Sequence, residues 1–211
     1  MRYTEYTLAD HAVPGLTPRQ QPRGPLVVPG KYIAELRYAG HTLRQPLAVE
    51  LDPRVHASQA DLIDQRDMAL KISRGMKSSY EAYQHVASLR KALEERTESL
   101  KDSGSKAFKQ AADSLTKKID AVEKGSKTAP GFGPVNRELG RLIFSVESAD
   151  LRPAEAVRSA IEHNCDALDK SLAKWKQLNN QDLASFNAML AESEVPALPV
   201  LTQSESVGCK P

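Results

Sequence analysis

The stretch SQADLIDQRDMALKISRGMKSSYEAYQHVASLRKALEERTESL, residues 58–100, decides the fold class because it predicts one long amphipathic helix. Ser58 and Asp61 have the spacing of a capping box at its start. Gly75 lies in mid-helix, where glycine costs about 1 kcal/mol relative to alanine, and we expect it to let another helix approach closely. The apolar residues recur at spacings of three, four and seven, as on one helix face. This apolar seam comprises Leu62, Ala69, Ile72, Met76, Tyr83, Val86 and Leu93, with Leu89 beside it.

Further helices follow, each with apolar residues at three-four spacing. We expect turns at 103–105 and 150–153 and a loop over 125–134, with Pro153 in a first helical turn. The last helix either continues past Asn179 or breaks there. Helices joined by short loops pack most simply as an antiparallel up-and-down bundle. The predicted core positions are Phe108, Ala112, Leu115, Ile119 and Val122; Val135, Leu139, Leu142, Ile143 and Val146; then Val157, Ile161, Cys165, Leu168, Leu172, Trp175, Leu178, Leu183, Phe186, Met189 and Leu190.

The chain before the long helix has a different character. Seven of the 13 prolines lie in residues 1–53 and none in 54–129, which marks a boundary between extended and helical structure. Residues 31–38 alternate, with Tyr32 and Leu36 on one face, and residues 41–51 return with Leu43 and Leu47 as apolar positions. The Ala39-Gly40 turn between them indicates a β hairpin.

Two strands cannot bury a core in water. Residues 3–8 add at most one more strand, which is far fewer than the strands of a β-sandwich. We therefore expect either that the strands dock on the helices or that the rest of their sheet lies upstream in a longer chain. The predicted organisation is a β segment at 1–54, the end of an incomplete immunoglobulin-like domain, a helical bundle at 55–195, and a disordered tail at 196–211.

Composition narrows the function classes. The net charge of +2 is too small to indicate a nucleic-acid partner, and the lysines of residues 101–127 are interspersed with carboxylates, as on a solvated helix face. No apolar run is long enough to span a membrane, and the N-terminal residues lack the apolar core of a signal peptide. Two cysteines, Cys165 and Cys209, do not make a disulfide framework, and we do not expect them to pair.

No catalytic, cofactor-binding or metal-binding residue is predicted, and we expect no enzyme activity. The chain has neither a serine-hydrolase elbow nor a phosphate-binding Gly-Lys-Ser/Thr motif. Gly131-Phe132-Gly133 has the Gly-x-Gly spacing found in nucleotide-binding loops, but it does not follow a predicted strand, so no nucleotide site is predicted there. Tyr83 and Trp175 are expected to be packing residues. None of the histidines is paired at helical spacing with another metal ligand; they are His11, His41, His56, His85 and His163.

Two groups of residues carry a resemblance to a known family. The first is Val28-Pro29-Gly30-Lys31-Tyr32 with Gly40 and then Asp52-Pro53-Arg54-Val55. The second is Glu138-Leu139-Gly140-Arg141-Leu142 with the downstream Trp175. Together they resemble the C-terminal region of large bacterial proteins with neuraminidase-type (BNR) or sortilin-like β-propeller repeats, often labelled glycosyl hydrolases.

The resemblance implies an accessory role in an exported multidomain protein. In that family an immunoglobulin-like domain follows the propeller, and a helical region closes the chain. No propeller is present here, so no catalytic residue is carried over, and any hydrolase label would belong to the absent propeller. The expected partners are upstream domains of the same native chain or another protein.

Two functional hypotheses result. The first is a non-catalytic accessory or interaction module, the C-terminal part of an exported β-propeller protein. The second is a free-standing coiled-coil adaptor that homodimerises through the helix at 58–100. No cofactor, nucleic-acid partner or membrane span is expected in either case.

Overall fold

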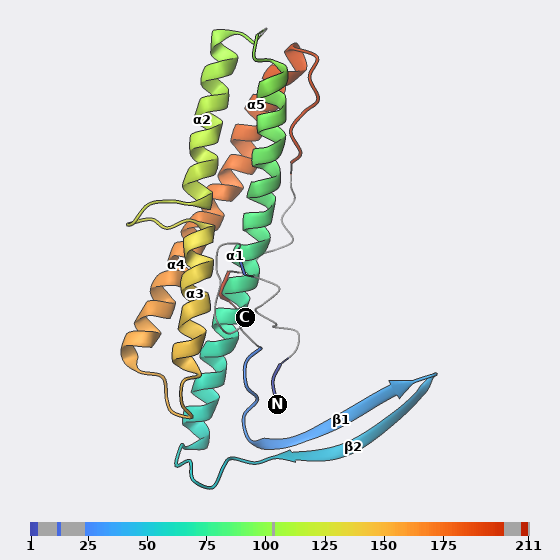
Figure 1. Ribbon diagram of the computed structural model, residues 1–211, viewed down its shortest axis with the longest axis vertical. Coiled ribbons are helices and arrows are strands. Elements are labelled where there is room, and N and C mark those ends of the chain that lie inside the picture. The colour runs from blue at the N-terminus through green and yellow to red at the C-terminus, as the bar shows by residue number, and fades with distance from the viewer. Residues whose placement is uncertain (4–11, 14–23, 103, 201–207, 211) are drawn as a thin grey trace.

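The computed structural model describes residues 1–3, 12–13, 24–102, 104–200 and 208–210, and it confirms a mainly helical fold with a β hairpin near the N-terminus (Figure 1). Helix α1 runs the length of the molecule, α2 and α3 follow one another back along it, and α4 and α5 return. The strands are β1 (Gly30–Tyr38) and β2 (His41–Val49); the helices are α1 (Gln59–Ser99), α2 (Lys106–Glu123), α3 (Phe132–Val146), α4 (Glu155–Gln177) and α5 (Leu183–Glu192).

Helix α1 begins and ends where its sequence predicts. The Ser58 hydroxyl accepts a hydrogen bond from the Asp61 backbone N–H at 3.2 Å, and the Asp61 carboxylate accepts one from the Ser58 N–H at 3.3 Å, so the capping box is confirmed. Along its 41 residues the apolar seam is buried except for the half-buried Tyr83. The other helices of the same chain cover this seam.

Helices α2 and α3 meet almost end to end across a tight connection. Gly131 is the N-cap of α3, and a Cβ there would lie 2.5 Å from the Val122 carbonyl oxygen, so only glycine fits. Helix α3 begins at Phe132, before the end of the loop expected over 125–134. Pro134 therefore lies in the first helical turn, where its missing N–H has no intrahelical partner to lose.

The connection from α4 to α5 settles the alternative at Asn179. The helical column continues through a π-helical turn, Leu178–Asp182, rather than breaking. At the other end of α4, the N-cap is Ala154 and the helix begins at Glu155, so Pro153 precedes the helix and is not in its first turn. The π turn lets the apolar positions of α4 and α5 face the same core; Trp175, Leu178, Leu183 and Leu190 are all buried.

Buried amides hold α3 against α1. Asn136 of α3 donates to the Met76 carbonyl and to the Ser79 hydroxyl of α1, each at 3.0 Å, and its oxygen accepts the backbone N–H of Val13 at 2.9 Å. Gln65 of α1 donates to the carbonyls that end α3 and follow it, those of Val146 at 2.6 Å and Ala149 at 2.7 Å. Each amide satisfies backbone groups that would otherwise be buried without partners.

Within the tail expected over 196–211, the structure describes residues 196–200 and 208–210, and both parts contact the bundle. Leu198 is buried, and its backbone N–H and C=O both bond to the Asn187 amide, at 2.7 and 3.0 Å. Cys209 is buried as well and forms a disulfide with Cys165 of α4. The expectation that these cysteines stay unpaired was therefore wrong, because a separation of 44 residues in sequence says nothing about their proximity in the fold.

None of the described helices is both long enough and apolar enough to cross a membrane.

Replacing Asn136 by alanine is expected to lower the free energy of unfolding by about 3 kcal/mol, since it removes three buried hydrogen bonds and leaves the Val13 N–H without its acceptor. Urea unfolding of the full chain followed by helical circular dichroism measures it. Asn164→Ala is the control, because the Asn164 amide donates only to the Ala160 carbonyl of its own helix. Equal losses in the two variants would contradict the bridging role of Asn136.

Candidate interaction surface

The β hairpin extends away from the helical bundle (Figure 1). Its turn is Ala39-Gly40, with φ of 46° and 81°, the two positive values that a type I′ turn requires. The turn sets an antiparallel register in which Tyr38 lies opposite His41 and Gly30 opposite Val49. The expected hairpin is thus confirmed, but its strands do not dock on the helices.

The register sorts the side chains into an apolar and a polar face, because residues directly opposite each other in a ladder point to the same side. The polar face carries an ion-pair group: Glu35 accepts from Arg37 Nε at 2.5 Å and from Arg44 Nε at 2.6 Å. Ile33 is the large apolar residue on this side. The apolar face carries Tyr32, Ala34, Leu36, Tyr38, Leu43, Leu47 and Val49, and the polar Gln45 and His41 share it.

The apolar face is open to solvent. Leu36 is 62% exposed, Leu43 68% and Tyr38 79%, values far from those of a sheet face that packs on a core. Apolar residues scattered singly on a surface are ordinary, but here they share one face of one ribbon. This grouping makes the hairpin face a candidate surface for contact with another molecule.

The two edges of the hairpin are not equivalent. Hydrogen-bonded pairs alternate with non-bonded pairs along an antiparallel ladder, starting from the bonded pair that flanks a two-residue turn. By that alternation Pro46, opposite Ile33, occupies a non-bonded position, where an N–H would point outward from β2. Proline removes that donor and weakens the outer edge of β2 for pairing. Strand β1 has no proline, so its outer edge keeps every donor and acceptor.

The root of the hairpin is fixed to the bundle. The Tyr32 hydroxyl donates to the Val28 carbonyl at 2.6 Å, and Gln59 Nε2 at the start of α1 donates to the Pro29 carbonyl at 3.1 Å. Farther along, Glu147 at the end of α3 accepts the Leu26 backbone N–H at 2.9 Å and pairs with Arg2 at 2.6 Å. These contacts set the direction in which the hairpin leaves the bundle.

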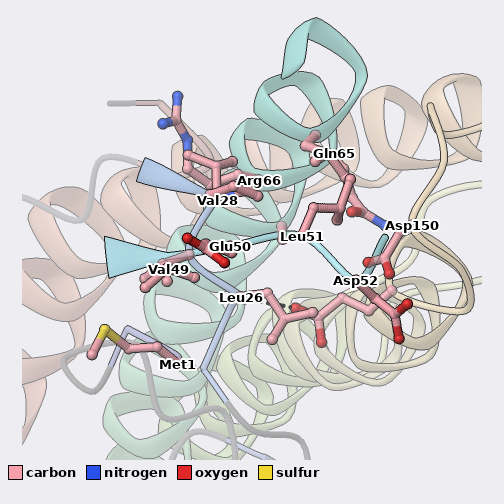
Figure 2. A pocket seen from close by; sticks show the side chains of 15 residues that line it. Met1, Leu26, Val28, Val49, Glu50, Leu51, Asp52, Gln65, Arg66 and Asp150 are labelled. Carbon is pink, nitrogen blue, oxygen red and sulfur yellow. Dashed lines mark hydrogen bonds between the residues drawn. The ribbon is translucent and has the colours of Figure 1, made fainter. Parts of the chain in front are cut away.

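A pocket of about 270 Å³ lies at this root (Figure 2). Val49 and Leu51 line it, so the apolar face of the hairpin continues into it. Met1 lies at one end of the view and Asp52 and Asp150 at the other. The Arg54 guanidinium, hydrogen-bonded to Asp52 at 2.6 and 2.9 Å, lowers the pKa of that carboxyl.

The chemistry of the pocket is limited. Its described lining contains no serine, threonine, cysteine, histidine or lysine side chain, and its charged side chains are those of Glu50, Asp52, Glu147, Asp150 and Arg66. Across the described ranges there is no group of three or more His, Cys, Asp or Glu side chains able to hold a metal ion.

The structure keeps apart the residues that the sequence analysis considered for chemistry. His41 lies at the hairpin tip, His85 in α1 and His163 in α4, while His11 falls outside the described residues. Gly131 and Gly133 serve the junction of α2 and α3. Trp175 is fully buried and Tyr83 packs against the core, as expected of packing residues.

Sequence reasoning found the hairpin but missed its open face, its unequal edges and the pocket at its root. The alternation of residues 31–38 and the position of Pro46 were the available signals for the faces and the edges. The pocket had no such signal, because residues from 1 to 150 line it together.

No family model, curated protein or solved structure matches the chain.

The open edge of β1 predicts an alternating pattern of amide exchange. The N–H groups of Ile33, Glu35 and Arg37 point outward and should exchange with solvent deuterium at nearly intrinsic rates, whereas those of Ala34 and Leu36 bond to β2 and should be slower. Residue-resolved exchange measured by NMR on the full chain checks this. Protection of all five amides would show that the β1 edge is already covered, and protection of none would show that the hairpin is not formed.

Proposed function

We propose that the protein is a non-catalytic interaction module that docks through its β hairpin. The observation that carries this proposal is the apolar face of a hairpin that extends from the bundle with Leu36, Tyr38 and Leu43 exposed. Transfer of each such side chain from water into an interface is favourable by about 1.5–3 kcal/mol. The apolar seam of the bundle is buried, and within the described ranges the hairpin holds half of the exposed large apolar side chains.

The dimensions of the hairpin indicate how a partner engages it. Strands of nine residues are about 30 Å long, and two strands give a face on the order of 300 Å². A stable interface needs about 800 Å² from each side. The face alone is too small, so a partner must also pair with the β1 edge or enter the pocket at the root. A β-sheet domain with an open edge strand meets these requirements.

The wider proposal is that this partner is an adjoining β domain of an exported BNR-repeat or sortilin-like protein, for which the chain is the C-terminal accessory part. The residues behind the resemblance support it, since Pro29-Gly30 opens β1, Gly40 makes the turn, and Asp52-Pro53-Arg54 follows β2. A preceding strand of an immunoglobulin-like sheet would pair with the open edge of β1. Hydrolase chemistry would then reside in another domain.

The adaptor alternative has less support. Homodimerisation through residues 58–100 needs an apolar seam that is free for a second copy, and the chain's own helices bury Ile72, Met76 and Val86 completely. The remaining surface of α1 is mostly polar.

Charged substitutions test whether the apolar face is the docking surface. Leu36→Lys with Leu43→Lys should abolish most of the fluorescence enhancement of bis-ANS, a dye that binds exposed apolar surface, and should leave the melting temperature within about 2 °C of the original because neither side chain is buried. Thr42→Lys with Ala48→Lys is the matched control, since it adds the same charge on the opposite face. Equal dye binding by both variants would contradict the proposal.

The wider proposal has its own test in the gene. A reading frame that continues upstream of the Met1 codon and encodes β-rich repeats supports it. An in-frame stop codon directly before Met1 contradicts the accessory role, without affecting the proposed docking face.

A further inference from the structure

The C-terminal residues 208–210 lie in a slot between α1 and α4. Cys209 is 3% exposed and Cys165 of α4 is 6% exposed, and the two sulfurs are bonded. Across the slot, the side of α1 that faces them is formed by Gly75. This site is on the bundle, independent of the hairpin and of the function proposed for it.

The slot is shaped for the bonded sulfur. A Cβ at Gly75 would lie 2.6 Å from Cys209 Sγ and 2.8 Å from Leu139 Cδ1, so any other residue at this position collides with the disulfide and with α3. Gly208 has a φ of +63°, and a Cβ there would lie 2.5 Å from Asp169 Oδ1. Gly75 thus makes room for the disulfide, and Gly208 lets the chain pass close to Asp169 just before Cys209.

Few other contacts hold the segment. Arg74 Nε donates to the Cys209 carbonyl at 3.4 Å, and Lys210 Nζ lies 3.4 Å from the Asp169 carboxylate, a largely exposed pair. Such contacts contribute little in water. The covalent bond is therefore the principal attachment of residues 208–210 to the bundle.

We infer that the mature protein contains the Cys165–Cys209 disulfide and that it folds in an oxidising compartment, as a substrate of a disulfide-donating oxidant. Disulfides of this structural kind form and persist outside reducing cytosol. In the step, the two thiols lose two protons and two electrons and form one S–S bond. The oxidant, a protein disulfide or oxidised glutathione, takes them up and becomes two thiols.

The burial of both sulfurs makes this a structural bond and not a rapid switch. Thiol–disulfide exchange requires a thiolate to reach one sulfur in line, and the slot leaves no room for it in the folded state. Reduction must wait until the segment opens. Closure of the long loop between the two cysteines restricts the unfolded chain and so favours the folded state.

The first experiment counts thiols in the full chain directed to the bacterial periplasm. Alkylation with iodoacetamide in denaturant without reductant, followed by mass spectrometry, should find no modified cysteine and a linked pair of peptides that contain residues 165 and 209. A free thiol at both positions, or a bond that joins two chains, would overturn the inference.

The second experiment compares the oxidised protein with the same chain purified from reducing cytosol. The reduced form should melt about 10 °C lower, and oxidised glutathione should restore the higher value. Without denaturant, dithiothreitol should reduce the folded, oxidised protein at least tenfold more slowly than it reduces the protein in urea. Equal melting temperatures for the two forms, or equally fast reduction in both conditions, would rule out the structural role.

Variants keep the test independent of a folding failure. Cys165→Ser with Cys209→Ser should retain the helical circular dichroism spectrum and melt at the temperature of the reduced protein, unaffected by reductant. Gly75→Ala should lower the melting temperature of the oxidised protein by more than it lowers that of the Cys209→Ala variant. The reason is that Cys209→Ala removes the sulfur with which the new Cβ collides. Additive effects would show that Gly75 serves only the packing of α3.

Discussion

Burial of the α1 apolar seam is the constraint on which the rest of the bundle depends. A single helix of 41 residues with an apolar stripe is unstable alone in water, so other helices must cover the stripe. Helices α3 and α4 cover the N-terminal part of α1, and α2 packs along the C-terminal part of α1. The positions of the remaining helices follow from this requirement, and buried amides such as Asn136 then fix how far α3 slides along α1.

The bundle and the hairpin satisfy opposite conditions. In the bundle most of the large apolar side chains of the helices are buried in one core. In the hairpin an apolar face, an unobstructed β1 edge and a pocket at the root remain open. Two strands are too few to be stable on their own in water, and the hydrogen bonds of Tyr32 and Gln59 hold only their root. The proposal that the hairpin is the docking part of the molecule rests on this contrast.

The C-terminal residues 208–210 are attached to the bundle by the Cys165–Cys209 disulfide. Through Cys209 they reach α4, and through the space at Gly75 they reach α1, so one bond connects elements far apart in sequence. The glycine in the middle of α1 lowers helix propensity, and the same absence of a side chain gives the sulfur and Leu139 their places. At Gly75 the helix therefore has a lower local propensity, and at the same point it is in close contact with Cys209 and Leu139.

The sequence by itself determined the features that depend on near neighbours: the capping box at Ser58, the period of the apolar seam, and the turn that sets the hairpin register. Each follows from contacts within a few residues, which a pattern records. Only the tertiary structure decided that Cys165 and Cys209 pair, that Leu198 is buried, and that the hairpin stands clear of the helices. It also decided that the chain's own helices bury the seam. These outcomes depend on which segments meet across the whole fold, and neither residue spacing nor composition carries that information.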